Sequence, residues 1–187
     1  MEINTLIQKV RQGDTDSFES IIRIYEQKIY RFCFFLLGDR QEAEDAVQDI
    51  FFKSYQHLAK YDSAHSFGAW LHKIAENHCR NLLKRRKRWI RLLPLFRLDS
   101  QVKSAEQVYS EQLGTELAYW FNGLSVPEKK LLLLRVVEDY SFEEIAQILD
   151  KSAPTIRKRF ERLKLKLKKN KLLREETKHH EQQFELR

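Results

Sequence analysis

Glycine and proline are scarce in this sequence, with 5 glycines and 3 prolines among 187 residues. Both residues interrupt regular backbone structure, and turn-rich β folds depend on them. Apolar residues make up 42% of the chain and recur mostly at intervals of three and four positions, the period of an amphipathic α-helix. The sequence therefore predicts an all-α protein with enough apolar residues to build a core.

Long apolar runs are also missing, and none approaches the ~20 residues that a membrane-spanning helix needs. The N-terminus, MEINTLIQKVRQGD, lacks the basic start and apolar centre of a signal peptide. The two cysteines, Cys33 and Cys79, fall within apolar helical patterns, so we expect buried free thiols in a reducing compartment. A disulfide between them has no support beyond their number. These features predict a cytoplasmic protein without membrane insertion.

Acidic residues are outnumbered by basic ones, 27 to 34, which gives a formal net charge of +7. The basic residues are concentrated in two segments, Lys84 to Arg88 and Arg157 to Lys171, and Glu161 is the only acid in the second. This charge favours a polyanionic partner, and two separate segments suggest two contacts with nucleic acid. Basic residues near a helix C-terminus also complement the helix dipole, which is the structural alternative.

Capping signals and apolar spacing predict the helices. Asp16 with Glu19 is expected to start one helix, which Gly38 ends, and Asp39 with Glu42 starts the next. A third helix begins at Phe67 and runs into the first basic segment. In the second half of the chain, the expected helices cover roughly 111–122, 126–138, 142–149 and 153–171.

Residues 141–163, SFEEIAQILDKSAPTIRKRFERL, predict two helices joined by a tight turn. Ser141 and Glu144 form a capping box. Ser152 can cap the second helix, and Pro154 falls in its first turn, where a missing N–H costs little. A helix followed by one with a basic outer face is the helix-turn-helix arrangement, whose second helix enters the DNA major groove. The structural alternative is a helical hairpin whose basic face is only solvated.

Acidic residues crowd the start of the helix that follows Asp39. Acids in a first turn favour the helix dipole, which is one explanation, but an acidic and aromatic helix face also suits protein docking. A metal site built from Asp45 and Asp49, one turn apart, has no His or other oxygen ligand placed to complete it. We therefore expect no metal and no cofactor.

A polar interruption, 61–66, separates this helix from the third one, whose polar side carries amide and basic residues. Aromatic rings stack on flipped bases, amides bond base edges and cations hold phosphates, so this mixture suits single-stranded DNA. Phe67 and Trp70 are better explained as core residues. Tyr61 and His65 lie in the interruption and are expected to be freer to contact a ligand.

Residues 13–88 resemble the region 2 domain of extracytoplasmic-function (ECF) sigma factors of bacterial RNA polymerase. The segments AEDAVQDIFFKSY and WLHKIAENHCRN carry most of that likeness. Residues 124–167 resemble the region 4 domain of the same family, in the expected order and with no region 3 domain between. The resemblance implies two small helical domains, with region 2 over 1–88, a linker over 89–110, region 4 over 111–171 and a charged tail, expected to fray, over 172–187.

The resemblance also implies a function, namely binding core RNA polymerase and directing it to −35 and −10 promoter elements. The core contacts are the β′ clamp helices and the β flap, and a further partner is an anti-sigma factor, in this family usually anchored in a membrane. The residues implied for core docking are Glu44, Asp45, Gln48, Asp49 and Phe52. Those implied for the −10 element are Tyr61, His65, Asn77, Arg80, Lys84 and Arg85. Those implied for the −35 element are Thr155, Arg157, Lys158, Glu161 and Arg162.

Two departures from the family pattern leave the −35 sequence open. The recognition helix starts with 153–156, Ala-Pro-Thr-Ile, where the family usually has Gly-Thr-Val. Glu161 stands where a neutral or aromatic residue is more usual, and an acid there either repels phosphate or accepts from cytosine N4.

A sigma factor is not an enzyme in its own right, so we expect no catalytic residues. Two other readings remain open. One is a stand-alone helix-turn-helix regulator, which leaves the acidic helix without a role. The other is a metal-dependent nuclease, for which the candidate ligands are Glu42, Glu44, Asp45 and Asp49.

Overall fold

The computed structural model describes residues 2–92 and 124–185, with side chains over 2–89 and 124–169. Every regular element within these ranges is helical, which confirms the predicted all-α class. The first range contains α1 (Ile3–Arg11), α2 (Asp16–Leu37), α3 (Arg40–Gln56), the 3₁₀ turn η1 (Leu58–Lys60) and α4 (Phe67–Leu92). The second contains α7 (Val126–Leu132), the π-helical segment η2 (Leu133–Val137), α8 (Phe142–Leu149) and α9 (Ala153–Glu185).

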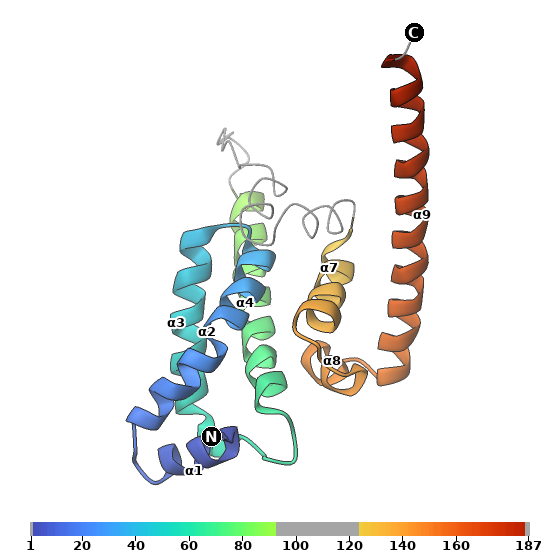
Figure 1. The fold of residues 1–187 in the computed structure, drawn as a ribbon. Coiled ribbons are helices and arrows are strands. Elements are labelled where there is room, and N and C mark those ends of the chain that lie inside the picture. Colours follow the sequence, from blue (N-terminus) through green and yellow to red (C-terminus); the bar gives the residue numbers. More distant parts are fainter. Residues whose placement is uncertain (1, 93–123, 186–187) are drawn as a thin grey trace.

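The N-terminal helices form a bundle in which α2, α3 and α4 pack against one another, and α1 packs on α2 (Figure 1). One apolar stripe on each helix explains this arrangement, because the stripes leave water together when they meet. The most deeply buried side chains of the bundle include Ile7, Ile21, Ile29, Phe32, Ile50, Phe67 and Leu71.

The C-terminal helices form a smaller unit in which α9 packs on α7 and α8. Its core includes Leu133, Leu134, Ile145, Ile148 and Ile156, which are fully buried. Asp150 ends α8 in the left-handed conformation, with φ of 52°, and this sharp turn sends the chain into α9. The predicted helix-turn-helix is therefore present.

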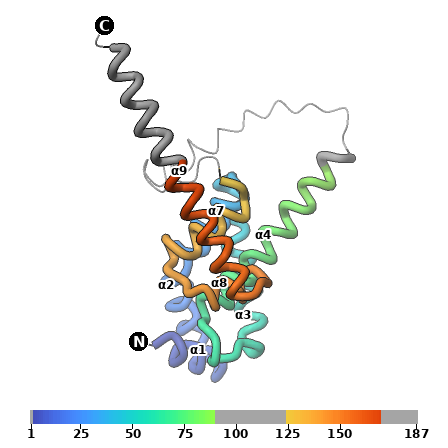
Figure 2. The backbone as a smooth tube through the Cα atoms, turned by 90° about the vertical axis from the view of Figure 1, so that its right-hand side faces the viewer, coloured from blue at the N-terminus to red at the C-terminus, as the bar shows by residue number. Residues whose placement is uncertain are grey.

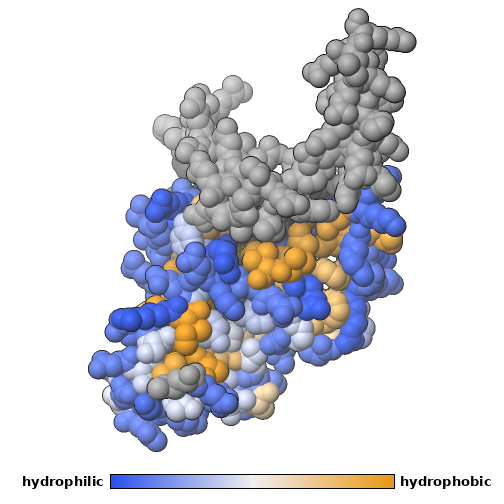
Figure 3. Space-filling model, in the orientation of Figure 1, coloured by the Kyte–Doolittle hydropathy of each residue, from blue (hydrophilic) through white to orange (hydrophobic). Residues whose placement is uncertain are grey.

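The two units lie side by side in Figure 1, with α4 facing the C-terminal helices, and in Figure 2 the C-terminal helices lie in front of the N-terminal ones. Helix α4 packs against α8, and α2 packs against α7. The face seen in Figure 3 is mostly hydrophilic, with separate hydrophobic areas. No helix among the described residues is long and apolar enough to span a membrane.

Most predicted helix boundaries are confirmed. Asp39 accepts a hydrogen bond from the Glu42 amide at 2.9 Å, Gly38 ends α2 with φ of 71°, and capping boxes start α7 and α8. The predicted cap of α2 was wrong, because Asp14 rather than Asp16 accepts from the Ser17 amide and hydroxyl.

Some helices differ from the expected ones, and some expected segments lie outside the described residues. Helix α1 was not predicted from the sequence. Helix α9 continues through most of the expected tail to Glu185, because 172–185 contains neither glycine nor proline to stop it. The helix expected over 111–122 and almost all of the linker expected over 89–110 lie outside the described residues. Helix α4 itself continues through the basic segment to Leu92.

The predicted free thiols are confirmed, since Cys33 and Cys79 are both buried and unbridged. They face each other across the packing of α2 on α4, where the hydrogen bond with Cys79 and burial raise the pKa of Cys33 well above its usual value.

Candidate nucleic-acid and protein-docking surfaces

Helix α3 presents one fully exposed face. Ala43, Val47 and Ile50 anchor its opposite side in the core, which leaves the residues implied for docking on the surface. Phe52 is 63% exposed, although burial of its ring would be favourable. The residues of this docking face are Glu44, Asp45, Gln48, Asp49 and Phe52, all exposed.

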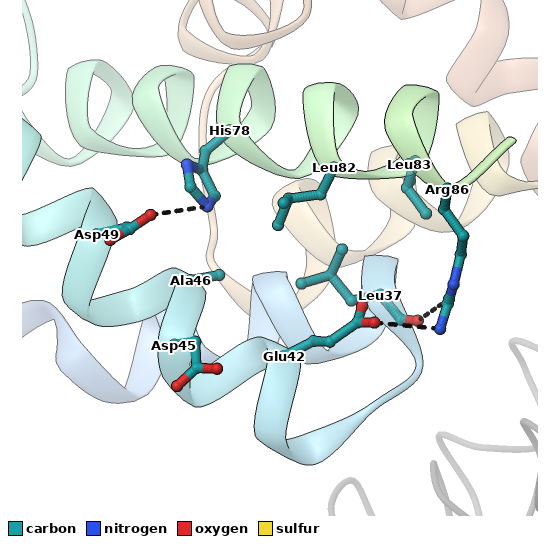
Figure 4. A pocket seen from close by; sticks show the side chains of 9 residues that line it. All are labelled: Leu37, Glu42, Asp45, Ala46, Asp49, His78, Leu82, Leu83 and Arg86. Carbon is teal, nitrogen blue, oxygen red and sulfur yellow. Dashed lines mark hydrogen bonds and ion pairs between the residues drawn. The ribbon is translucent and has the colours of Figure 1, made fainter. Parts of the chain in front are cut away.

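A hollow of about 250 Å³ lies beside the docking face, between α3 and α4 (Figure 4). Leu82 and Leu83 of α4 line it from one side, and Asp45 and Asp49 of α3 line it from the other. It therefore combines an apolar wall with an acidic rim.

Polar contacts from α4 brace the two ends of this hollow. Lys53 Nζ lies 2.7 Å from His78 Nδ1, and His78 Nε2 lies 3.7 Å from an Asp49 oxygen. Burial and the charge of Lys53 lower the pKa of His78, so the ring is neutral and Nδ1 accepts from the ammonium group. At the other end Arg86 Nη2 donates to Glu42 at 3.2 Å.

His78 was not among the candidate residues, and Arg86 was expected only as part of the basic segment along DNA phosphates. His78 sits in the apolar register of α4, and a polar residue in an apolar stripe is the signal that could have identified it. Arg86 belongs to the basic segment, and its sequence position gave no sign of a partner 44 residues away.

The interruption between α3 and α4 is held by hydrogen bonds from α1 and by others within the loop. Arg11 Nη2 donates to the Leu58 and Tyr61 carbonyls, and Asp62 accepts from the Ala64 amide at 2.9 Å. The Tyr61 hydroxyl donates to the His65 carbonyl at 2.6 Å. The loop is therefore a preformed turn.

Tyr61 corrects one expectation. Its side chain is only 4% exposed, with its ring packed against Phe67 and Trp70 at centroid distances of 5.2 and 5.4 Å. It is therefore not free to contact a ligand, because its ring packs in the apolar cluster that anchors the loop to α4. Phe67 is buried and Trp70 partly buried, which confirms their assignment to the core.

The other residues implied for the −10 element lie on or next to α4. His65 is exposed, and its Nδ1 accepts from the Gln147 amide of α8 at 3.3 Å. Arg80 donates to the Asn77 side-chain oxygen at 2.6 Å, so that carbonyl oxygen is occupied and the amide NH₂ remains available. Lys84 and Arg85 are exposed about one turn beyond Arg80.

Helix α9 displays the side chains implied for the −35 element on its outer surface. Arg157 pairs with Glu143 of α8, and its guanidinium lies 5.7 Å from the centre of the Phe142 ring. Glu161 pairs with Lys164 at 2.8 Å. The Ser152 hydroxyl lies 2.8 Å from the Thr155 hydroxyl at the helix start. Lys158 and Arg162 are exposed.

Over the described residues, no group of three or more His, Cys, Asp or Glu side chains is arranged to hold a metal ion.

Two family models match the chain, Sigma-70 region 2 over residues 21–89 and Sigma-70 region 4 over residues 120–167. Among curated relatives, the ECF RNA polymerase sigma factor SigW of Bacillus subtilis is 30% identical over 186 residues, covering 90% of this chain and 96% of that protein. The RNA polymerase sigma-H factor of Pseudomonas aeruginosa is 29% identical over 165 residues, covering 82% and 86% of the two chains.

Solved structures share the fold. The sigma factor RpoE of Bartonella quintana, bound to the anti-sigma factor NepR, matches with a TM-score of 0.65 and 20% identity, over 83% of this chain and 96% of that one. CnrH, bound to the cytosolic domain of CnrY, matches with a TM-score of 0.65 and 21% identity, over 88% and 93%. The family matches, the relatives and the two helical units together show that this chain belongs to the ECF sigma factors of the sigma-70 family, which direct transcription initiation.

Proposed function

We propose that this sigma factor docks on core RNA polymerase through α3, captures a flipped base of the −10 element beside α4, and reads the −35 element with α9. The observation that carries the proposal is the docking face. A phenylalanine that is 63% exposed among acidic and amide side chains has no structural role in the free chain. Such a residue is typical of a protein-binding surface.

The docking face complements a basic partner surface, and the β′ clamp helices of polymerase are the partner that the family implies. The β flap is the corresponding partner for the C-terminal unit. An anti-sigma factor is a further proposed partner, supported by the structure of RpoE, which contains one. With polymerase as its partner, the protein acts as a non-enzymatic initiation factor in the cytoplasm.

At the −10 element, the rigid turn after α3 supplies a wall and α4 supplies the polar contacts. The Asn77 amide can bond a base edge, and Arg80, Lys84 and Arg85 can hold the neighbouring phosphates. Unstacking a base costs a few kcal/mol, and a preformed pocket with cationic contacts offsets that cost. Tyr61 then acts by shaping the loop from within rather than by stacking on the base.

At the −35 element, α9 enters the major groove with Lys158 and Arg162 on its exposed side. Arg157 is already oriented by Glu143 and by the Phe142 ring, so little of its side-chain freedom is left to lose on binding. Glu161 must leave Lys164 to contact DNA, and cytosine N4 is the base donor that suits it.

The test is run-off transcription with purified bacterial core polymerase, with and without this protein, on a pool of genomic promoter fragments. We expect transcripts that depend on the protein, and their aligned start sites would define both promoter elements. If the protein neither supports transcription nor binds core, yet retards duplex DNA, a stand-alone regulator replaces this proposal.

Two paired variants separate the proposed surfaces. Asp45→Lys with Asp49→Lys should abolish co-purification with core, because it reverses the charge of the docking face. The exposed pair Asp16→Lys with Glu19→Lys makes the same charge change elsewhere and should leave core binding intact.

Arg157→Ala with Arg162→Ala should weaken promoter binding by 10-fold or more, at roughly 1–3 kcal/mol per specific contact, and leave core binding intact. The matched control is Lys9→Ala with Arg23→Ala, two exposed basic residues outside both basic segments. Equal loss of core and promoter binding in either experiment contradicts the division of roles.

A further inference from the structure

Arg157 of α9 is held by two side chains from the start of α8. Its Nη2 atom donates to a Glu143 carboxylate oxygen, and its Cζ atom lies 5.7 Å from the centre of the Phe142 ring. The hydrogen bond directs one N–H group, and the cation–π contact favours a place over the ring, so the two restraints act together on one guanidinium. The Arg157 side chain is nevertheless 51% exposed. The group is therefore both oriented and accessible.

The Phe142 ring is itself fixed by neighbours. It packs edge to face against Phe160 of α9 at a centroid distance of 5.6 Å, and the Cζ atom of Arg135 lies 5.0 Å from its centre. Arg135 is anchored in turn, because its Nη1 atom donates to the Tyr140 carbonyl at 2.9 Å. The ring is therefore a stationary support for Arg157.

The backbone of Glu143 is fixed by the capping box that starts α8. The Ser141 amide donates to the Glu144 carboxylate at 2.8 Å, and the Ser141 hydroxyl accepts from the Glu144 amide at 3.2 Å. Glu143 lies between these two residues in the first turn, where an acid also complements the helix dipole. Its position therefore does not depend on Arg157.

This arrangement suits the reading of a base better than the holding of a phosphate. Helix α9 begins at Ala153, so Arg157 lies just after the first turn, and the N-terminal residues of a recognition helix contact base edges. Glu143 offsets the charge of Arg157, which weakens its attraction to phosphate. A guanidinium has several N–H donors and Glu143 engages one of them. The others suffice for a bidentate pair with O6 and N7 of guanine.

We propose that Glu143 and Phe142 are positioning residues of the −35 interface. They hold the Arg157 guanidinium in one orientation, in which it reads a guanine of the −35 element. Glu143 then contributes specificity and no affinity, because a carboxylate beside DNA repels phosphates. The guanine role rests on the proposed function of α9, whereas the restraint on Arg157 can be measured in the free chain.

The restraint is measured in the full free chain by ¹⁵N relaxation of the arginine Nε groups. We expect the Arg157 N–H bond to be ordered, and Glu143→Ala to make it mobile. Glu19→Ala removes the partner of Arg23 from an exposed ion pair on α2 and should leave Arg157 unchanged. A mobile Arg157 in the unchanged chain, or one that stays ordered in Glu143→Ala, would overturn the proposal.

The role in recognition is measured with the holoenzyme, assembled from purified core polymerase and the full chain. Promoter fragments randomised over the −35 element are bound, and sequencing of the bound fraction gives the preference for each base at each position. We expect one position with a guanine preference of about 10-fold or more. Arg157→Lys should abolish it, because an ammonium group cannot form the bidentate pair.

Glu143→Ala should lower this guanine preference by about 3-fold or more and leave the preferences at other positions unchanged. Affinity for fragments with another base at that position should not fall, since the lost carboxylate repelled phosphates. In an Arg157→Ala background, Glu143→Ala should not change any base preference, because Glu143 acts through Arg157. Phe142→Tyr, which keeps the ring, should retain the guanine preference, and Phe142→Leu should weaken it.

The remaining outcomes count against the proposal in distinguishable ways. Equal loss of affinity for all bases in Glu143→Ala would overturn it, because Glu143 would then only support the fold. A stronger guanine preference in Glu143→Ala would overturn it too, since Glu143 would then keep Arg157 from DNA. A preference that depends on Arg157 but not on Glu143 would overturn it with the proposed function intact. An ordered Arg157 whose substitution changes no base preference would overturn the guanine role together with the proposed −35 role of Arg157.

Discussion

His72 shows how a single side chain ties the two units together. Its ring is fully buried between Phe32, at a centroid distance of 5.2 Å, and Tyr140 at 5.1 Å. Burial, with smaller contributions from Lys28 and Arg31, lowers the pKa of His72 to about 4. A carbonyl can only accept, so the bond to Gly68 assigns the ring proton to Nδ1 and leaves Nε2 without a hydrogen-bond partner. The imidazole is therefore neutral in this structure.

This pKa predicts a loss of stability in mild acid. The folded-state pKa lies below the unfolded value of about 6.5, so the unfolded chain binds the extra proton first. The contribution of His72 is fully present above pH 6.5 and is lost as the pH falls towards 4, by about 3 kcal/mol. Urea unfolding across this range measures it, with His72→Gln as the comparison. Identical pH profiles for the two proteins would contradict the assignment.

Neighbouring phenylalanines on α3 provide a second prediction at this scale. Phe51 is buried and Phe52 is 63% exposed, so one residue step separates a core side chain from a docking side chain. Phe51→Ala should lower the free energy of unfolding by about 3–5 kcal/mol. Phe52→Ala should leave stability within about 0.5 kcal/mol but weaken core binding. Unfolding curves and co-purification with core measure both effects, and a large stability loss in Phe52→Ala would argue against docking.

At the scale of elements, the sequence predicted the helices whose positions are determined by local capping and apolar spacing. Capping boxes and apolar spacing located α7, α8 and the start of α9, because each signal lies within one or two helical turns. The α2 cap was misjudged because Asp14 and Asp16 both precede the apolar stripe, and only geometry selects between them. Helix α1 was missed because it lacks the capping signal that marked the other helices: Glu2, which precedes it, makes no side-chain cap hydrogen bond.

The docking face could be predicted from the sequence, whereas the residues implied for the −10 element could be placed only in part. The exposed residues of α3 follow from its helical period, since a stripe that faces the core fixes the stripe that faces water. Tyr61 was misplaced because a loop position says little about burial, and the cluster with Phe67 and Trp70 forms only when the loop folds back on α4. The assignment of individual bases or phosphates to side chains stays a prediction.

At the scale of the whole molecule, the cross-unit contacts had no signal in the sequence. Arg31 and Glu138 are 107 positions apart, and each could equally have been a solvated charge on its own helix. The need for a glycine at residue 68 becomes clear only when the position of Tyr140, which packs against it, is known. Long-range pairing of this kind depends on how complete surfaces fit, which local periodicity does not record.

The contact between the two units, which includes the ion pair of Lys130 with Glu76, predicts a pattern of local protection. In Glu76→Lys, amides of α7 and α8 should exchange with deuterium faster than in the unchanged chain, because the partly buried Lys130 loses its partner. Amides of α2 and α3 should keep their protection, since the N-terminal core is untouched. Adding Lys130→Glu should restore slow exchange in α7 and α8. Uniformly faster exchange throughout the chain would instead indicate general destabilisation.

The two buried thiols have a consequence for signalling. Oxidants attack the thiolate form of cysteine, and attack needs solvent access. Cys33 and Cys79 are buried, and the raised pKa of Cys33 keeps it protonated. The described part of the chain is thus chemically insulated from oxidants, so an oxidative signal that changes its activity has to be sensed by another protein and relayed through contact.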